Sequence, residues 1–216
     1  MGMASSEPRS VKISDNERTG WSSDRPRRPG EAERPPRKLD VSVRGRVLSP
    51  TDRMRYSPGS LVLIACADPT QRARFTARVI DEQSAVLSAD KVRALLAGKV
   101  PADQLEAKAQ ALLDAAASKR FAAGQTVVVP LETLAAEERE RFVRLAAAHR
   151  RARHLVLVEV SKDAVSDADK ELLGDLRTAL NAGELGQEGF MTSLRLGGHV
   201  IEELKKIVFA PPPADD

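Results

Sequence analysis

Ser60-Leu-Val-Leu-Ile-Ala65 is a short apolar run, and the residues that follow it decide the fold. Runs of four to eight apolar residues are typical of strands that are buried on both faces. A turn, Cys66-Ala-Asp-Pro-Thr70, and a helical pattern over residues 71–81 come next. Ala85-Val-Leu87 then predicts a second strand. This stretch therefore predicts a strand, a turn, a helix and a strand in that order.

The same alternation continues to the end of the chain. Thr133 is placed to cap one of the later helices, with Glu137 near the reciprocal position of a capping box. Strands that alternate with helices of 10 to 20 residues predict βαβ units and a three-layer α/β fold with a mostly parallel sheet. The later elements are predicted at 101–123 (helix), 126–129 (strand), 133–149 (helix), 155–158 (strand), 167–180 (helix), 191–196 (strand) and 199–207 (helix).

The first 58 residues differ in composition from the rest. They hold 13 Lys and Arg against 8 Asp and Glu, whereas residues 59–216 hold 21 against 23. Proline recurs among the arginines, and little apolar surface is available for a core, so we expect a disordered basic tail. The predicted organisation is a tail over 1–58, one domain over 59–209 and a short flexible C-terminal tail over 210–216.

Four residues of the tail are candidates for binding a partner. Val41, Val43 and Val47 alternate with polar residues, which predicts an edge strand or a strand formed on a partner. Trp21 is the only tryptophan, and it is either an exposed linker residue or an anchor in a partner's pocket. We therefore expect a protein partner or larger assembly bound through the tail, and nucleic acid stays an alternative because of the tail's cations.

Composition also excludes several classes of protein. Cys66 is the only cysteine, so no disulfide forms within the chain, which fits a reducing cytoplasm. No run approaches the roughly 18 apolar residues that span a bilayer, so no membrane is expected. His149, His154 and His199 have no metal-ligand spacing with Cys66 and are interpreted as structural or surface residues. We expect a cytoplasmic protein without a metal or cofactor.

Several stretches together resemble the P-loop kinase domain of bacterial polynucleotide kinases and related small kinases. The stretches are the strand at 60–65, Val86-Leu-Ser-Ala-Asp90 with the helix after it, Gly124-Gln-Thr-Val-Val-Val129, and the helix and strand over 135–158. They cover about residues 58–209. The resemblance implies a P-loop NTPase-like fold, ATP-dependent phosphoryl transfer and an acceptor-activating base at Asp90. A helix cap is the structural alternative for Asp90.

The phosphate-binding residues of that family are replaced in this chain. A Walker A loop needs Gly-x-x-x-x-Gly-Lys-Ser/Thr, and those four positions align with Ala65, Thr70, Gln71 and Arg72. The acidic residue that the family carries at the end of its next strand aligns with Pro130. Glu132, two residues on, is interpreted as an exposed loop acid, with a displaced carboxylate of the site as the alternative. The Walker A motif is therefore degenerate. The positions of the family's lid arginines correspond to Lys162, Lys170 and Arg177, which we interpret as a solvated helix face.

Three functions follow as hypotheses. The first is a non-catalytic P-loop-fold protein, a pseudoenzyme, that acts as a binding, scaffold or structural assembly component through its tail. The second is an atypical ATP-dependent nucleotide or polynucleotide kinase that uses Arg72 or Arg74 together with Asp90. The third is an accessory protein that binds nucleic acid through the cations of its tail.

Overall fold

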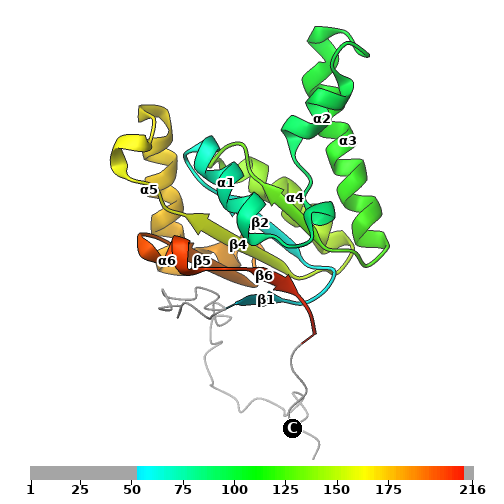
Figure 1. Ribbon diagram of the computed structural model, residues 1–216. Coiled ribbons are helices and arrows are strands. Elements are labelled where there is room, and N and C mark those ends of the chain that lie inside the picture. Colours follow the sequence, from blue (N-terminus) through cyan, green and yellow to red (C-terminus); the bar gives the residue numbers. More distant parts are fainter. Residues whose placement is uncertain (1–52, 212–216) are drawn as a thin grey trace, which may run out of the picture. The chain divides into compact units, whose positions relative to one another are not determined.

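A four-stranded parallel sheet forms the centre of the fold (Figure 1). The computed structural model describes residues 53–211. The strand order is β3-β2-β4-β5, and every residue of the inner strand β2 is buried. The predicted α/β class with a mostly parallel sheet is confirmed. The strands are β2 (Leu61–Ala65), β3 (Val127–Pro130), β4 (Arg153–Val158) and β5 (Thr192–Leu196).

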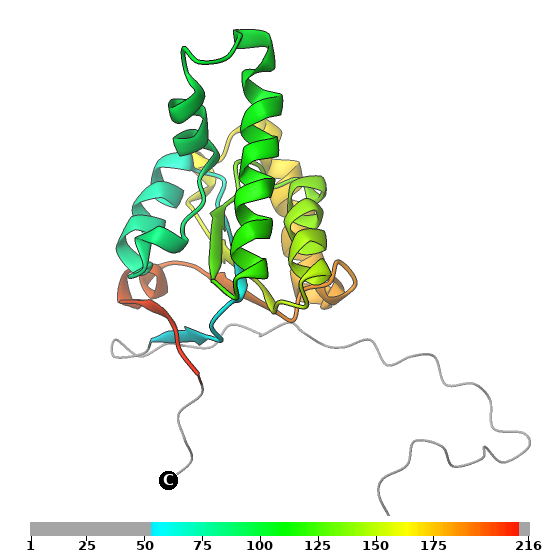
Figure 2. The same ribbon diagram turned by 90° about the vertical axis from the view of Figure 1, so that its right-hand side faces the viewer.

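Helices cover both faces of this sheet and complete three layers (Figure 2). One face carries α1 and α6, and the other carries α4 and α5, with α3 packed against α4 and β3. Leu61 and Leu63 point to one face and Val62 and Ile64 to the other, and all four are fully buried. The helices are α1 (Pro69–Val79), α2 (Ala89–Leu96), α3 (Ala102–Ala122), α4 (Ala136–Ala148), α5 (Asp167–Ala182) and α6 (His199–Glu203).

The strand predicted at residues 86–87 is reduced to a single bridge. Val86 pairs with Val128 of β3, and the amide of Leu87 donates to the Val128 carbonyl at 2.9 Å. A 3-10 turn over Gln83–Ala85 precedes the bridge, and α2 begins three residues after it. The segment is therefore too short to form a strand of its own beside β3.

Helix α2 and the first half of α3 form an arm that stands away from the sheet (Figure 1). Helix α2 buries no residue, and Leu95 and Leu112 are 62% and 44% exposed. Only one stripe of α3 is buried, and it consists of Ala109, Leu113, Ala117 and Phe121. The arm therefore depends on few apolar contacts, and polar side chains at its base hold it to the sheet.

A second, two-stranded parallel sheet corrects two predictions about the ends of the fold. It consists of β1 (Met54–Tyr56) and β6 (Ile207–Phe209). The predicted tail boundary at residue 58 is therefore too late, because Met54 joins the core and Tyr56 stacks on His154 with ring centroids 4.3 Å apart. The closing helix also ends at Glu203 and not at Ile207, since fully buried Ile207 bridges Ile80 after α1.

Trp21, Val41, Val43 and Val47 lie outside the described residues. Within residues 53–211, no helix combines the length and the apolar character that crossing a membrane requires.

The C-terminal ends of α3 and α4 share one capping geometry. At the end of α3, the amides of Gly124 and Gln125 donate to the carbonyls of Phe121 and Arg120. This is a Schellman motif, and Gly124 has the left-handed φ of 73° that the motif requires. At the end of α4, the amides of Arg150 and Arg151 donate in the same way to the carbonyls of Ala147 and Ala146.

Arg150 thus occupies a position that favours glycine. Its φ is 56°, and it is the one non-glycine residue with a positive φ among those that the structure describes. A residue with a Cβ atom is strained in this region, by about 1–2 kcal/mol. The end of α4 is therefore less stable than its sequence could make it.

Gly59 allows the chain to enter β2 close against the end of α3. A Cβ atom on Gly59 would lie 2.8 Å from the carbonyl oxygen of Gly124, and the φ of Gly59 is 76°. The amide of Gly59 donates to the hydroxyl of Thr126 at 3.0 Å. The starts of β2 and β3 and the end of α3 are therefore fixed against one another at one end of the sheet.

We expect Arg150→Gly to stabilise the fold. Relief of the left-handed strain outweighs the larger backbone entropy that glycine has in the unfolded chain, so unfolding in urea should cost about 0.5–1 kcal/mol more. Arg150→Ala keeps the Cβ atom and is the matched control, which should show no gain. An equal or lower stability of Arg150→Gly would contradict the strain.

Candidate functional site

The turn between β2 and α1 is the position at which the family resemblance places a phosphate-binding loop. Here the side chain of Asp68 caps the helix itself: its Oδ1 accepts hydrogen bonds from the amides of Thr70 at 2.8 Å and Gln71 at 3.2 Å. A helix N-terminus attracts anions because its first amides have no partner within the helix. In this turn a carboxylate of the chain already holds two of those amides.

Pro69 removes a further donor from the same turn. It is the first residue of α1, where proline is well tolerated because its missing N–H would have had no helical partner. The result is a well-capped helix that presents few free amides. A Walker A loop works in the opposite way, since its glycines expose successive amides to the phosphates. The turn is therefore built to begin a helix.

Arg72 does not point freely from this turn. The residue is 8% exposed, and its Nη1 donates to the backbone carbonyl of Glu132 at 3.2 Å. Glu132 follows β3, so this contact joins the start of α1 to the end of the neighbouring strand. One of the two cations that the kinase hypothesis offers is therefore engaged in packing two elements together.

The carboxylate of Glu132 is engaged as well, which corrects the prediction of an exposed loop acid. Both of its oxygens accept hydrogen bonds from Arg93 of α2, one of them at 2.6 Å. Arg93 also contacts Glu106 of α3 at 2.8 Å and Asp90 at 2.9 Å. Hydrogen bonds to Glu132 and then to Glu106 raise the pKa of Arg93. Arg93 is thus the clamp that fixes the base of the arm to the sheet.

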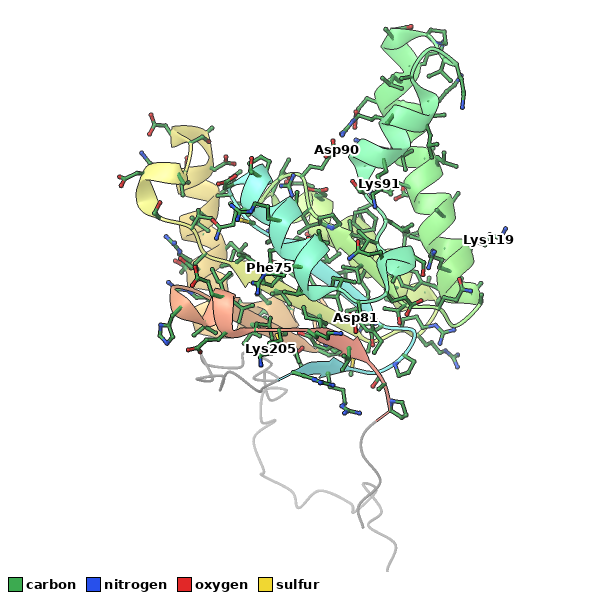
Figure 3. All side chains as sticks on the ribbon, in the orientation of Figure 1. Phe75, Asp81, Asp90, Lys91, Lys119 and Lys205 are labelled. Carbon is green, nitrogen blue, oxygen red and sulfur yellow. The ribbon has the colours of Figure 1, made fainter. Side chains whose placement is uncertain are left out.

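Asp90 lies in the first turn of α2, and its side chain is 79% exposed (Figure 3). The helix begins at Ala89 with Ser88 as the capping residue, so Asp90 is not the cap that we predicted as its structural alternative. A carboxylate in the first turn still interacts favourably with the helix dipole. Its one ion pair with a described residue is to Arg93, which is also bound by two other carboxylates.

The structure brings the sequence candidates to one small cavity. A cavity of about 190 Å³ between α1, α2 and the end of β3 is lined by Arg72, Asp90, Lys91, Pro130 and Glu132, among others. Pockets for drug-sized ligands usually measure about 300–1,000 Å³. The cavity therefore gathers the right types of side chain but is small for a nucleoside triphosphate.

A larger groove, of about 860 Å³, runs along the other flank of α1 toward α6. Arg74, Arg78 and Phe75 line it, with Glu202 on the facing side. Arg78 is occupied, because its guanidinium donates to the last carbonyls of α6, including Leu204 at 3.0 Å and Glu202 at 3.2 Å. The groove therefore has mixed charge, and one of its two arginines closes the end of a helix.

A second cluster lies where β4 ends. Glu159 accepts hydrogen bonds from Arg177 of α5 and from Arg195 of β5, at 2.9 and 2.6 Å. Burial by itself would raise the pKa of Glu159, but these two guanidiniums outweigh it and lower that pKa. Arg177 is thus a structural partner of Glu159 and not part of a solvated face, whereas Lys170 pairs with Asp167 on the same helix turn. The side chain of Lys162 lies outside the described part of the chain.

The histidines and the cysteine are placed as structural or surface residues. His149 contacts the hydroxyl of Ser118 at 3.0 Å, His154 contacts that of Thr192 at 2.7 Å, and His199 is exposed. Burial raises the pKa of the Cys66 thiol, which is 2% exposed. Across residues 53–211, no group of three or more His, Cys, Asp or Glu side chains could hold a metal ion.

The sequence predicted the turn but not the contacts of the charged side chains at the base of the arm. Arg93 and Glu106 had no signal beyond the spacing of Asp90 and Arg93, three residues apart on one helix. The predicted cap of α4 was also displaced: Glu138, and not Glu137, reaches back to the amides of Glu132 and Thr133, at 3.1 and 2.8 Å. These contacts join segments whose approach depends on the assembled sheet.

Comparisons with known proteins identify solved structures with low similarity. No protein-family model matches the chain, and no curated protein matches it. A protein from Chloroflexus aurantiacus, described as a proposed kinase, has 12% sequence identity and a TM-score of 0.37, over 64% of this chain and 85% of that one. The tunicamycin resistance protein of Deinococcus radiodurans has 15% identity and a TM-score of 0.37, over 71% of this chain and 99% of that one. Similarity at this level assigns neither a family nor an activity.

The buried imidazole of His154 should make stability depend on pH. Burial, reinforced by the charge of Arg153, lowers the pKa of His154 from 6.5 to about 4. Between those values the unfolded chain binds a proton that the folded chain does not, so stability falls as the pH falls. From pH 7 to pH 5 the free energy of unfolding should drop by about 2 kcal/mol.

Urea unfolding of His154→Phe measures this contribution. Phenylalanine keeps the stacking with Tyr56 but cannot take up a proton, so most of the loss between pH 7 and pH 5 should vanish. His199→Gln changes an exposed histidine and is the matched control, with the pH dependence of the unmodified protein. An unchanged pH dependence in His154→Phe would show that other groups cause the loss.

Removing the Arg93 clamp should loosen the arm. In Arg93→Met, Glu132 keeps its half-buried position without its cation and beside Glu106, so stability should fall by about 1–2 kcal/mol. Amide hydrogen exchange over Ala89–Leu96 should accelerate more than exchange in β2. Lys91→Met, at an exposed neighbouring cation, should change neither quantity. Equal exchange of α2 in Arg93→Met and the unmodified protein would contradict the clamp.

Proposed function

We propose that this chain is a non-catalytic binding or assembly module. One observation carries the proposal: the carboxylate of Asp68 takes the amides of Thr70 and Gln71, at the turn where a P-loop enzyme would hold its phosphates. A bound triphosphate would have to displace that carboxylate and would meet its negative charge. Pro69 offers no amide in its place.

Three neighbouring groups support the same interpretation. Arg72 is bound to the carbonyl of Glu132, and the carboxylate of Glu132 is held by Arg93. A magnesium ion would need free carboxylate or hydroxyl oxygens at this place, as in P-loop enzymes. Catalysis of phosphoryl transfer would thus require breaking several contacts at once, and each of them stabilises the fold.

The tail would supply the attachment to a partner. Its first 52 residues include Trp21 and the alternating Val41, Val43 and Val47, and the chain enters the fold through β1. A segment that orders on binding can cover a large surface of its partner.

Deleting residues 1–52 should therefore abolish the complex between this chain and its protein partner, while β1 and the rest of the fold remain intact. Full-strength binding without the tail would contradict this part of the proposal.

One observation favours an atypical kinase as the second candidate. Arg72 and Asp90 line the same cavity, with Lys91 beside them. An acceptor hydroxyl could approach Asp90, whose side chain is largely exposed (Figure 3). The candidate requires the cavity to widen, because its volume of about 190 Å³ is below that of usual ligand pockets.

Calorimetric titration with Mg-ATP separates the two candidates. The unmodified protein should show no binding at millimolar nucleotide, because Asp68 holds the amides that a phosphate would use. Its thermal midpoint should also stay constant, whereas a ligand at 100 times its Kd would add about 2.7 kcal/mol of stability. A micromolar Kd would favour the kinase.

Asp68→Ala tests the cap directly. Loss of the capping carboxylate should lower the free energy of unfolding by about 1 kcal/mol. Asp68→Asn keeps an oxygen acceptor without the charge and should recover most of that loss. If Asp68→Ala were as stable as the unmodified protein, the carboxylate would not be holding the two amides.

A further inference from the structure

Five cations gather at the end of the sheet opposite the capped turn. Arg55 lies on β1, Lys119 and Arg120 lie in the last turn of α3, and Arg150 and Arg151 precede β4. The register pairs Leu61 with both Val127 and Arg153, so the segments that lead into β2, β3 and β4 share this end. We call these five residues the basic edge. Figure 3 shows Lys119 on the lower part of α3, away from Asp90 and Lys91.

Contacts with neighbouring segments connect three members of the basic edge. Arg151 donates from Nε and Nη2 to the carbonyl of Phe121, at 3.0 and 2.6 Å. Phe121 is the residue directly after Arg120 in sequence. Arg120 lines a hollow of about 270 Å³ together with Gly59, Gly124 and Phe209. Arg55 donates to the carbonyl of Pro211, two residues beyond Phe209, at 3.0 Å. Arg151, Arg120 and Arg55 are therefore linked through neighbouring backbone at the starts of the strands. Lys119 and Arg150 are the sequence neighbours of Arg120 and Arg151.

None of the five forms an ion pair with another described residue. Asp81, next to Glu82 in sequence, pairs with Lys206. Glu82 is the acid that lines the hollow beside Arg120. The basic edge therefore keeps a net positive charge, although residues 59–216 as a whole carry two more acids than bases.

The strained backbone of Arg150 indicates that the positive charge of the basic edge has a role in binding. Cations near the ends of α3 and α4 complement the helix dipoles, and that effect alone could explain Lys119, Arg120 and Arg151. It does not explain an exposed arginine at φ 56°, where glycine stands in the matching motif of α3. Strain at a surface position with no internal contact to justify it points to a role in binding.

We propose that the basic edge binds the phosphate backbone of duplex nucleic acid without reading its sequence. Four of its five cations are arginines. The side chains of Arg55, Arg120 and Arg151 already donate to backbone carbonyls, so they would bind phosphate oxygens through their remaining N–H groups. The inference rests on the proposed function only in taking the chain as a binding module. It names the ligand of a surface that lies apart from the capped turn.

Other anionic partners fit this surface less well. Unpaired strands are usually bound by exposed aromatic side chains, and every aromatic residue within 53–211 is buried or half-buried. A membrane surface would be expected to meet several apolar anchors, whereas Met191 is a lone exposed large apolar residue near the start of β5. The tail, which enters the fold two residues before Arg55, adds 11 Lys and Arg to the same ligand. The regularly spaced phosphates of a duplex can be contacted by both the basic edge and the tail.

Fluorescence anisotropy with a labelled 20-base-pair DNA of arbitrary sequence tests the proposal on the full chain. The affinity should fall roughly 10²–10³-fold between 50 and 200 mM salt if about five phosphates are contacted. The variant Arg55→Gln/Lys119→Gln/Arg150→Gly should lower the slope of log affinity against log salt by about 0.9 for each cation removed. Lys99→Gln/Lys108→Gln/Lys170→Gln removes the same charge from the arm and α5, and should bind as the unmodified protein does.

The single variant Arg150→Gly separates a loss of binding from a loss of folding, because we expect it to be more stable than the unmodified protein. It should raise the urea midpoint and weaken duplex binding at the same time, which a merely structural residue would not do. If the slope of log affinity against log salt were the same in the triple variant as in the unmodified protein, the tail alone would bind DNA. That result would overturn the proposal. Absence of duplex binding at 50 mM salt, or binding of poly-glutamate in its place, would also overturn it. None of these results would alter the expected lack of ATP binding.

Discussion

Two hydrogen bonds from the amides of Thr70 and Gln71 to the carboxylate of Asp68 determine what the end of β2 can do. A helix that follows a buried parallel strand presents its first amides at the sheet edge where α/β proteins usually bind ligands. Here the chain supplies its own anion at that place. The turn is consequently stable and closed, and neighbouring side chains have taken structural partners instead of ligands.

The same pattern recurs along the C-terminal ends of the strands. Glu132 after β3 is neutralised by Arg93, and Glu159 after β4 is neutralised by Arg177 and Arg195. Each of these carboxylates stands where a parallel-sheet enzyme would place a catalytic or metal-binding group. Guanidiniums in two-pronged contact with carboxylates are among the stronger polar contacts in proteins. This edge of the sheet thus serves to hold the arm and α5 in position.

The sequence predicts the buried strands and long helices well, because their signals are local. The all-apolar run of β2 and the β-branched run of β3 identify strands, and the helical pattern places α3 within a residue at each end. Partners that meet only in the folded chain escape such reasoning. Ile207 continues a helical pattern but pairs with β1, and Arg93 gives no sign in sequence of its contact with Glu132.

Chemical-shift titration of the ¹⁵N-labelled protein with Mg-ATP tests the central claim most directly, because it reports on the two capping amides themselves. If the Asp68 carboxylate holds them, the signals of Thr70 and Gln71 should stay in place at millimolar nucleotide, while in Asp68→Ala they should move from their original positions before any nucleotide is added. Saturable shifts of these two signals in the unmodified protein would show that phosphate displaces the carboxylate, and would contradict the account.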